Sequence, residues 1–251
     1  MTDLMMELLI DLHKDNKRQG PGSNADTLRA LSFIEVEKDK TYKIADMGCG
    51  TGAQTISLAK AIKSEIVAVD LLPDFLNKLE QDAKAEGVGH KITRLEASMD
   101  QLPFSKEEFD IIWSEGAIYN IGFENGIKRW KPFLKKGGYI ALSEITWLTD
   151  ERPSEINDYW ESEYPEISPA SSKIKILEEN NFSPVGYFYL PQSSWIDHYY
   201  QPLEDGFNDF LKKHNYSDAS KAIVEEEKRE IYLYKKYKEY ISYGFYVARK
   251  I

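Results

Sequence analysis

The stretch that decides the fold is Ile44–Gly52, with the sequence IADMGCGTG. Its first residues form a β-rich run and its last residues precede a helical segment, so the glycines lie in a strand-to-helix turn. Glycines at positions 48, 50 and 52 let the backbone turn tightly and let a ligand approach atoms that a Cβ would shield. The loop therefore predicts a ligand site, although a purely structural turn uses similar residues.

Two acidic residues indicate what kind of ligand this loop binds. The glycine spacing is G-x-G-x-G and not the G-x-G-x-x-G of dinucleotide sites. Asp46 stands two residues before the first glycine, where its carboxylate would face the crevice, repel a pyrophosphate and attract an ammonium or sulfonium group. Asp70 follows Gly50 by 20 residues, a position from which an acid accepts hydrogen bonds from ribose hydroxyls. The predicted ligand is a nucleoside with a cationic tail, and S-adenosylmethionine fits this description.

The chain around this loop alternates short β-rich runs with helical segments, which is typical of a parallel sheet covered by helices. The β-rich runs are at 42–47, 65–70, 91–95, 109–114 and 139–145, and helices are expected between them at 53–62, 74–86 and 124–131. Other helices are expected in 1–14, 24–34, 170–180 and most of 195–240, and further strands at 185–190 and 243–249. Residues 146–170 contain three prolines and are expected to be irregular.

These elements predict an α/β fold with a doubly wound, mostly parallel seven-stranded sheet, N-terminal helices and a helical insertion before the last strand. We expect one domain over residues 1–251. Its parts would be the N-terminal helices (1–40), the cofactor-binding core (41–145) and the substrate-side segments with a helical cap and the final strands (146–251). With 42% hydrophobic residues, the chain can bury a core without disulfides or a structural metal.

The composition argues against several classes of protein. Lys and Arg number 32 and Asp and Glu 42, so the net charge of −10 has the wrong sign for a nucleic-acid-binding protein. No apolar run approaches a membrane span, and Asp3 and Glu7 stand where a signal peptide needs positive charge. The lone Cys49 excludes an internal disulfide and a Cys-rich zinc site. We expect a cytoplasmic protein without nucleic-acid, membrane or metal partners, and a homodimer remains open.

Several stretches resemble the class I (Rossmann-like) S-adenosylmethionine-dependent methyltransferases, in particular the bacterial small-molecule group related to the quinone-biosynthesis methyltransferases. The resemblance rests on IADMGCGTG at 44–52, Asp70, EASMDQLPF at 96–104 and KKGG at 135–138. Together these stretches cover roughly residues 40–145. The resemblance implies that the chain transfers a methyl group from S-adenosylmethionine to a small-molecule acceptor by in-line displacement.

The resemblance also assigns roles to residues of the core. The methionine part of the cofactor would lie along Asp46, Gly48 and Gly50. Asp70 with Leu71 would hold the ribose. Ser98 and Met99 would flank the adenine, although many relatives carry Asp at the position of Ser98, and serine is a weaker acceptor than a carboxylate. The full set of expected cofactor contacts is Asp46, Gly48, Cys49, Gly50, Thr51, Gly52, Gln54, Asp70, Leu71, Ser98, Met99, Ser114, Glu115 and Gly116.

A general base is needed only if the acceptor must lose a proton, because positioning and exclusion of water can supply much of the rate enhancement. The candidate catalytic residues are His198, Glu115 and Tyr119. Glu144 is a weaker candidate that neighbours in the sheet could satisfy. The alternative for His198 is a surface or packed histidine on an amphipathic helix.

Aromatic side chains in segments that follow strand ends, or that form insertions, could cover a small apolar acceptor. The expected substrate contacts are Tyr119, Trp147, Tyr159, Trp160, Trp195 and Tyr199. Ordinary packing of a helical cap on the sheet is the alternative for each of them.

Two other functions remain as alternatives to a methyltransferase. A non-catalytic nucleoside-binding module would keep the loop and lack an acceptor site, and the aromatic residues after position 145 argue against it. A nicotinamide-dependent oxidoreductase is disfavoured by Asp46 and by the glycine spacing.

Overall fold

The computed structural model describes residues 3–251, and these residues form a single mixed sheet. Seven strands follow the order β3-β2-β1-β4-β5-β8-β7, and the two-residue strand β6 pairs only with β5. The strands are β1 (Tyr42–Met47), β2 (Ser64–Asp70), β3 (Ile92–Glu96), β4 (Phe109–Glu115), β5 (Leu134–Trp147), β6 (Ser168–Pro169), β7 (Phe182–Tyr189) and β8 (Ile241–Lys250). The predicted doubly wound sheet is confirmed, with β6 as an addition.

Strand direction places the ends that matter for binding at one edge of the sheet. The pairs from β3 through β1 to β5 are parallel, and β8 runs antiparallel to both β5 and β7. The chain leaves β1 toward β2 on one side and returns to β4 on the other, so the strand order reverses beside β1. In open α/β sheets, ligands bind at such a reversal, outside the carboxyl ends of the strands.

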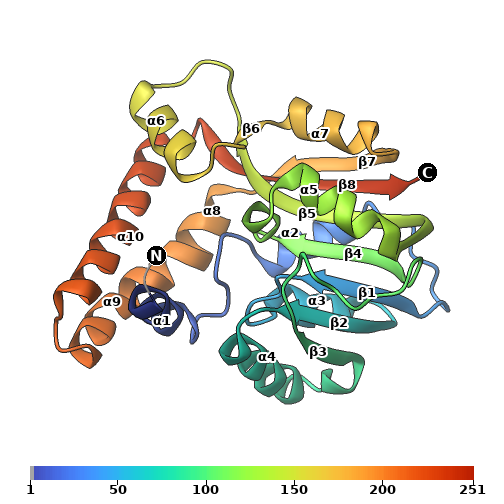
Figure 1. Cartoon of the computed structure of the whole chain (residues 1–251), viewed down its shortest axis with the longest axis horizontal. Coiled ribbons are helices and arrows are strands. Elements are labelled where there is room, and N and C mark those ends of the chain that lie inside the picture. Colours follow the sequence, from blue (N-terminus) through green and yellow to red (C-terminus); the bar gives the residue numbers. More distant parts are fainter. Residues whose placement is uncertain (1–2) are drawn as a thin grey trace.

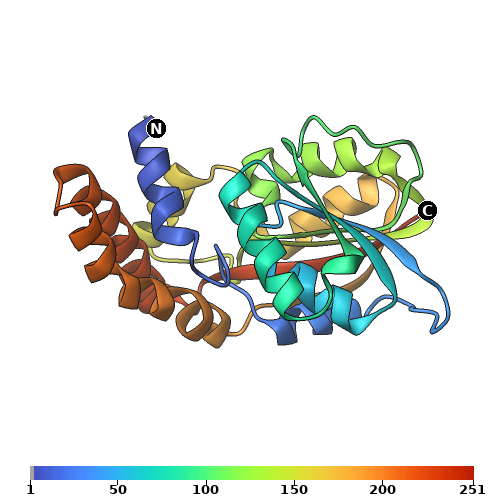
Figure 2. The same ribbon diagram turned by 90° about the horizontal axis from the view of Figure 1, so that it is seen from below.

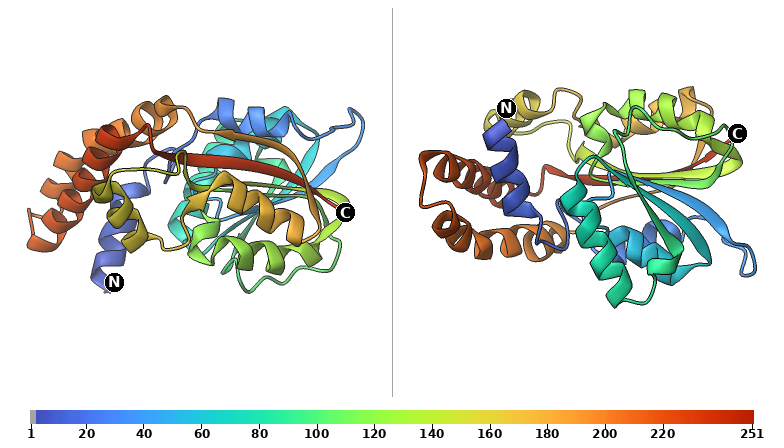
Figure 3. Two further views of the ribbon diagram at one scale, coloured as in Figure 1. Left: turned by 90° about the horizontal axis from the view of Figure 1, so that it is seen from above. Right: turned by 60° about the horizontal axis from the view of Figure 1, so that its bottom comes forward.

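Helices cover both faces of the sheet (Figures 1 and 3). One face packs against α2 (Asn24–Leu31), α3 (Ala53–Ala61) and α4 (Pro73–Ala85), and the other against α5 (Phe123–Trp130) and α7 (Ala170–Glu179). Single 3-10 turns are η1 (Gly89–Lys91), η2 (Ile118–Asn120) and η3 (Lys131–Phe133). The buried residues form two hydrophobic clusters, one on each side of the sheet. The strands are apolar because both of their faces are covered.

A helical cap extends beyond the carboxyl edge of β5 and the start of β8 (Figure 2). It contains α6 (Ser154–Glu163), α8 (Gln192–Trp195), the π-helical turn η4 (Ile196–Tyr200), α9 (Gln201–Lys213) and α10 (Asp218–Tyr237). The N-terminal helix α1 (Asp3–His13) packs against α9 and α10, although it lies about 200 residues away in sequence. The expected helical insertion before the last strand is therefore present, and α1 joins it.

The segment 146–170 differs from the irregular stretch that we expected. It contains helix α6, which begins directly after Pro153 and ends two residues before Pro165. Proline is tolerated before the first helical turn and after the last, so here it delimits a helix instead of preventing one. Residues 1 and 2 of the first predicted helix lie outside the described residues. Within residues 3–251, no helix is both long and apolar enough to cross a bilayer.

Candidate cofactor and acceptor site

The glycine-rich loop has the conformation that its sequence predicts. Gly48, Gly50 and Gly52 have φ angles of +68°, +55° and +81°, in the left-handed region that favours glycine. A Cβ on Gly48 would clash with Ala117 and come within 2.9 Å of Met99 Cε. The loop after β1 therefore lies directly against the segments that follow β4 and β3, as a cofactor shared by these three segments requires.

Asp46 lies beneath the loop and not at its surface. The side chain is fully buried, and it accepts hydrogen bonds from Thr55 Oγ1 at 2.5 Å and Gln54 Nε2 at 3.4 Å. Desolvation is the main cause that raises the pKa of Asp46 to about 7, and the nearby carboxylates of Glu115 and Asp70 raise it further. The expectation that this carboxylate faces an open crevice is thus wrong, but three acids do surround the loop.

Asp70 lies at the end of β2, close to the loop. One carboxylate oxygen accepts from the Gly50 amide at 2.8 Å and the other from the Leu72 amide at 3.0 Å. Desolvation raises its pKa. Each carboxylate oxygen keeps a lone pair for a further donor such as a ribose hydroxyl. The next residue, Leu71, is 62% exposed and offers an apolar surface beside this carboxylate.

Near the expected adenine position, the structure supplies the carboxylate that Ser98 lacks. The Ser98 hydroxyl donates to Asp100 Oδ1 at 2.5 Å. Because that bond uses the hydroxyl proton, the acceptor capacity here belongs to Ser98 Oγ and Asp100 together. Sequence reasoning missed Asp100, since a residue two positions away contacts Ser98 only in this local turn.

The segment between α1 and α2, residues 14–22, passes over the loop, and we call it the N-terminal strap. The Thr51 amide donates to Gln19 Oε1 at 2.9 Å, and the Thr51 hydroxyl donates to the carbonyls of Asn16 and Lys17. Gln19 Nε2 in turn donates to the carbonyl of His13 at 3.2 Å. The strap thus holds the end of α1 close to the cofactor loop.

A buried ion pair fixes the strap to the end of β4. Arg18 Nη1 lies 2.8 Å from Glu115 Oε2, and the two side chains are 8% and 5% exposed. Glu115 Oε1 accepts from Thr27 Oγ1 at 2.7 Å and from Trp113 Nε1 at 2.9 Å. Glu115 is therefore engaged in a structural network and not placed as a free base, which corrects its predicted catalytic role.

The neighbours of Glu115 are also held by the sheet. The Ser114 hydroxyl donates to the Met47 carbonyl at 2.8 Å, and the Gly116 amide donates to Ser143 Oγ at 2.9 Å. A Cβ on Gly116 would come within 2.8 Å of the Tyr243 ring. Tyr243 therefore packs beside the expected sulfonium position.

Around Tyr243 lies a group of phenols and carboxyls from distant parts of the chain. We call it the tyrosine–glutamate cluster, and its members are Tyr119, Tyr199, Tyr200, Glu227, Glu230 and Tyr243. Burial raises the pKa of each of the four tyrosines, and the carboxyls add to the effect. Yet Tyr119 is 45% exposed, and Tyr199 and Tyr243 are only half-buried. Tyr119, Tyr199 and Tyr243 are thus packed against protein and still partly exposed to solvent, whereas Tyr200 is fully buried.

His13 brings a base to this cluster. Its Nε2 lies 3.2 Å from Glu227 Oε1, and its ring stacks on Tyr199 with the centroids 6.3 Å apart. The side chain is buried, and Nδ1 has no hydrogen-bond partner among the described residues. A carboxylate that orients one ring nitrogen leaves the other available for proton transfer. No sequence pattern predicts this pair, because its members are 214 residues apart.

A second buried carboxyl, Glu144, lies just beyond the end of β4. It is 1% exposed, and Lys173 Nζ is 3.5 Å from its Oε1, but neither carboxylate oxygen has a hydrogen-bond partner among residues 3–251. Desolvation raises the pKa of Glu144 to about 7 and lowers the pKa of Lys173. The expectation that sheet neighbours satisfy Glu144 is not met, since its partner comes from α7.

The remaining predicted catalytic and substrate residues do not all lie at the tyrosine–glutamate cluster. His198 is exposed on η4, which agrees with the surface alternative, and its role as a base stays a prediction. Trp195 is 1% exposed and stacks on Tyr234 at 4.3 Å, which makes it a packing residue. Tyr159 lies near Glu230 and contacts Trp160 at 5.3 Å, so both remain close to the cluster.

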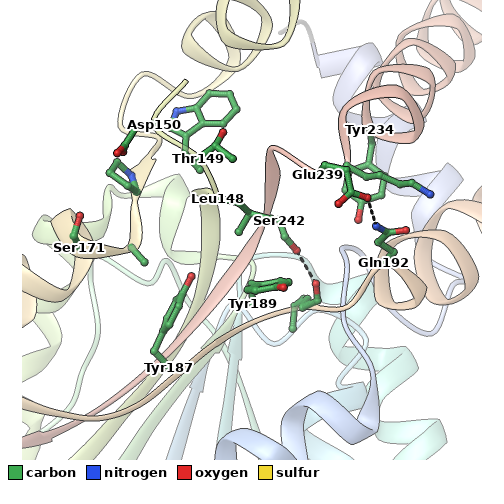
Figure 4. A pocket seen from close by; sticks show the side chains of 15 residues that line it. Leu148, Thr149, Asp150, Ser171, Tyr187, Tyr189, Gln192, Tyr234, Glu239 and Ser242 are labelled. Carbon is green, nitrogen blue, oxygen red and sulfur yellow. Dashed lines mark hydrogen bonds between the residues drawn. The ribbon is translucent and has the colours of Figure 1, made fainter. Parts of the chain in front are cut away.

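Trp147 instead lines a separate cavity of about 570 Å³ (Figure 4). Side chains of β7, β8 and α10 converge there, among them Tyr189, Ser242 and Tyr234. Trp195 lies between this cavity and the cluster, because it stacks on Tyr234, donates to Ser242 and contacts Tyr243. The cavity is thus separated from the glycine-rich loop, and Trp147 is not part of the cluster.

Comparisons with known proteins agree with the geometry of this site. Residues 44–138 match the family described as a methyltransferase domain. The chain is 31% identical to the chloroplastic tocopherol O-methyltransferase of Arabidopsis thaliana over 172 residues, which are 68% of this chain and 44% of that protein. It is 25% identical to the ubiquinone/menaquinone biosynthesis C-methyltransferase of Agrobacterium fabrum over 133 residues, 52% of this chain and 51% of that one. The chain thus spans about half the length of these two relatives.

A solved structure extends the likeness in fold to the whole chain. The S-adenosylmethionine-dependent methyltransferase of Geobacter sulfurreducens, crystallised with S-adenosyl-L-homocysteine, superposes with a TM-score of 0.84. The superposition covers 100% of this chain and 99% of that chain at 14% identity. The glycine-rich loop, the acids Asp46 and Asp70 and this sheet order agree with both likenesses: residues 44–138 are a methyltransferase domain, and the chain has the class I, Rossmann-like fold of the S-adenosylmethionine-dependent methyltransferases.

Proposed function

We propose that this chain, acting as one domain over residues 1–251, methylates a small-molecule acceptor bound at the tyrosine–glutamate cluster. The observation that carries the proposal is the packing of Tyr243 on Gly116, which places the cluster beside the end of β4. The strap supports it, because it contacts the loop through Gln19 and directly follows His13, the last residue of α1, which contacts Glu227 and Tyr199 of the cluster. An acceptor at the cluster would therefore lie next to the transferred methyl group.

The residues around the loop fit S-adenosylmethionine, which supplies the methyl group when it is bound. The glycines allow the tight, left-handed turns of the loop and its close packing on Gln19, Ala117 and Leu79, and the nearby carboxyls of Asp70 and Asp46 favour a cation. Gly48, Gly50 and Thr51 would lie along the methionine part, Asp70 and Leu71 would hold the ribose, and Met99, Ser98 and Asp100 would flank the adenine. Cys49, Gly52 and Gln54 shape the loop from beneath.

The cluster would contribute position and proton transfer. Methyl transfer needs the acceptor atom held in line at near-attack distance with water excluded, and the phenol rings can do both. Where the acceptor must lose a proton, His13 Nδ1 would accept it while Glu227 orients the ring. Tyr199, Tyr119 and Tyr159 would contact the acceptor, with Trp160 behind them.

We further propose that the enzyme works in the cytoplasm. The acidic composition and the single, buried cysteine are in keeping with that compartment. A homodimer remains an open expectation.

Titration calorimetry tests the proposed cofactor site. We expect S-adenosylmethionine and S-adenosylhomocysteine to bind in preference to NAD, because the loop spacing and Asp70 suit a nucleoside without a pyrophosphate. Asp70→Ala should lower the affinity for both adenosyl compounds about tenfold or more, because hydrogen bonds to a charged group contribute about 1.5–3 kcal/mol. Glu225→Gln, on an exposed face of α10, is the control. Preferential binding of NAD, or unchanged affinity in Asp70→Ala, would refute the proposal.

A further inference from the structure

We propose that the acceptor is an organic amine, recognised as its ammonium form by the tyrosine–glutamate cluster. This inference rests on the proposed function and names the chemical class of its acceptor. It follows from the absence of a protein cation at Glu230, from the phenol rings around that carboxyl, and from the unpartnered nitrogen of His13.

Glu230 is a carboxyl that lacks a cation. It accepts a hydrogen bond from Tyr200 Oη at 2.9 Å, and no Lys, Arg or His in the described part of the chain forms an ion pair with it. Its charged neighbours are the acids Glu227, Glu163 and Glu226. Desolvation, with these acids, raises the pKa of Glu230 to about 7. A carboxyl enclosed in this way is stabilised as an anion only when a cation joins it.

The protein cations near the cluster already have partners. Arg229 lies 3.9 Å from Glu226 and over the Tyr159 ring at 5.4 Å, and its side chain is 62% exposed. Lys173 is paired with Glu144 and donates to the carbonyl of Glu166. Neither residue supplies Glu230 with a counter-ion, so a cationic ligand is the partner that would hold this carboxyl in its ionised form.

The phenol rings near Glu230 supply aromatic surfaces of the kind that bind organic cations. Tyr119, Tyr199 and Tyr243 come from three different elements, and each is influenced electrostatically by Glu230. No hydrogen bond engages the hydroxyls of Tyr199 or Tyr243 within residues 3–251. Aromatic faces beside a carboxylate are the usual means of binding ammonium groups. A carboxylate or phosphate ligand would be repelled here by Glu227 and Glu230.

His13 completes the arrangement for an amine. Its Nδ1 is buried without a partner and would accept one proton from the bound ammonium. The freed nitrogen lone pair then forms the new bond to the methyl carbon. The carbon–sulfur bond breaks, its electron pair stays on sulfur, and the products are the N-methylated ammonium and S-adenosylhomocysteine. No oxidant or further reactant is needed.

The test compares two probes of equal shape and different charge. Choline and its neutral isostere 3,3-dimethylbutan-1-ol are titrated into the full-length protein saturated with S-adenosylhomocysteine. We expect choline to bind at least about tenfold more tightly than the neutral alcohol, because aromatic faces attract a desolvated cation. Glu230→Gln should remove most of this preference. Glu225→Gln makes the same chemical change on the same helix, at a side chain that is 71% exposed. This control variant should keep the preference for choline.

The first titration, with S-adenosylhomocysteine alone, separates the two levels of the proposal. Binding of S-adenosylhomocysteine to Glu230→Gln shows that this variant is folded. Equal affinity for the two probes, binding of neither, or an undiminished preference in Glu230→Gln would overturn the amine inference and leave the proposed function standing. Failure of S-adenosylhomocysteine to bind the wild-type protein would overturn the proposed function itself.

Discussion

The substitution Glu230→Gln should stabilise the protein at neutral and alkaline pH, and much less at pH 5. Glutamine keeps an oxygen that can accept the hydrogen bond from Tyr200. It removes the negative charge that Glu227, Glu226 and Glu163 oppose. The variant therefore relieves a cost that exists only when Glu230 is ionised.

The size of this effect follows from the pKa of Glu230. The carboxyl titrates at 4.5 in an unfolded chain and at about 7 in the folded protein. Since the folded state holds the proton more tightly, the contribution to stability is full below pH 4.5 and is lost as the pH rises through 7. The complete shift corresponds to about 3 kcal/mol, which partial exposure reduces to about 1–2 kcal/mol. In melting temperature this is a rise of about 3–6 °C.

Urea unfolding at pH 5 and pH 8 measures the difference. We expect Glu230→Gln to exceed the wild type by about 1–2 kcal/mol at pH 8 and by much less at pH 5. Glu225→Gln serves as the matched control, because Glu225 makes only an exposed pair with Lys228. Equal effects of Glu230→Gln at both pH values, or a loss of stability at pH 8, would refute the assignment of Glu230 as a desolvated carboxyl.

Four other substitutions test the rest of the site. Arg18→Ala leaves Glu115 buried without its cation and should lower the free energy of unfolding by about 3 kcal/mol in urea; a loss below about 1 kcal/mol would contradict the buried pair. Gly50→Ala places a methyl group against Gln19 at a φ of +55° and should weaken S-adenosylhomocysteine binding about tenfold by calorimetry, whereas unchanged affinity would separate this loop from the cofactor. Tyr199→Ala and Trp160→Ala should each slow acceptor turnover while S-adenosylhomocysteine affinity stays intact, and full turnover in both variants would remove these residues from the acceptor site.

The cofactor side of the fold could be predicted because its signals are local. The strand, the glycine turn and the helix after it lie within about 20 residues, so spacing alone predicts their arrangement. Asp70 is likewise placed by the length of one β–α–β unit. The loop geometry and the sheet order agree with that prediction.

The acceptor side could not be predicted, because its side chains meet only through tertiary packing. His13 and Glu227 are 214 residues apart, and no periodicity relates them. Glu115 has the sequence position of a catalytic acid, but Arg18 from the strap neutralises it. His198 has the right aromatic neighbours in sequence, and the π-helical turn leaves it exposed. In each case the deciding partner comes from another part of the chain.

One consequence follows from the strap that joins α1 to α2. Gln19 covers the loop amide of Thr51, and His13, six residues earlier, belongs to the acceptor side. An adenosyl compound and an acceptor therefore enter past the same covalent segment. Their arrival and departure should be kinetically ordered, and strengthening the strap should slow release of the demethylated product more than the chemical step.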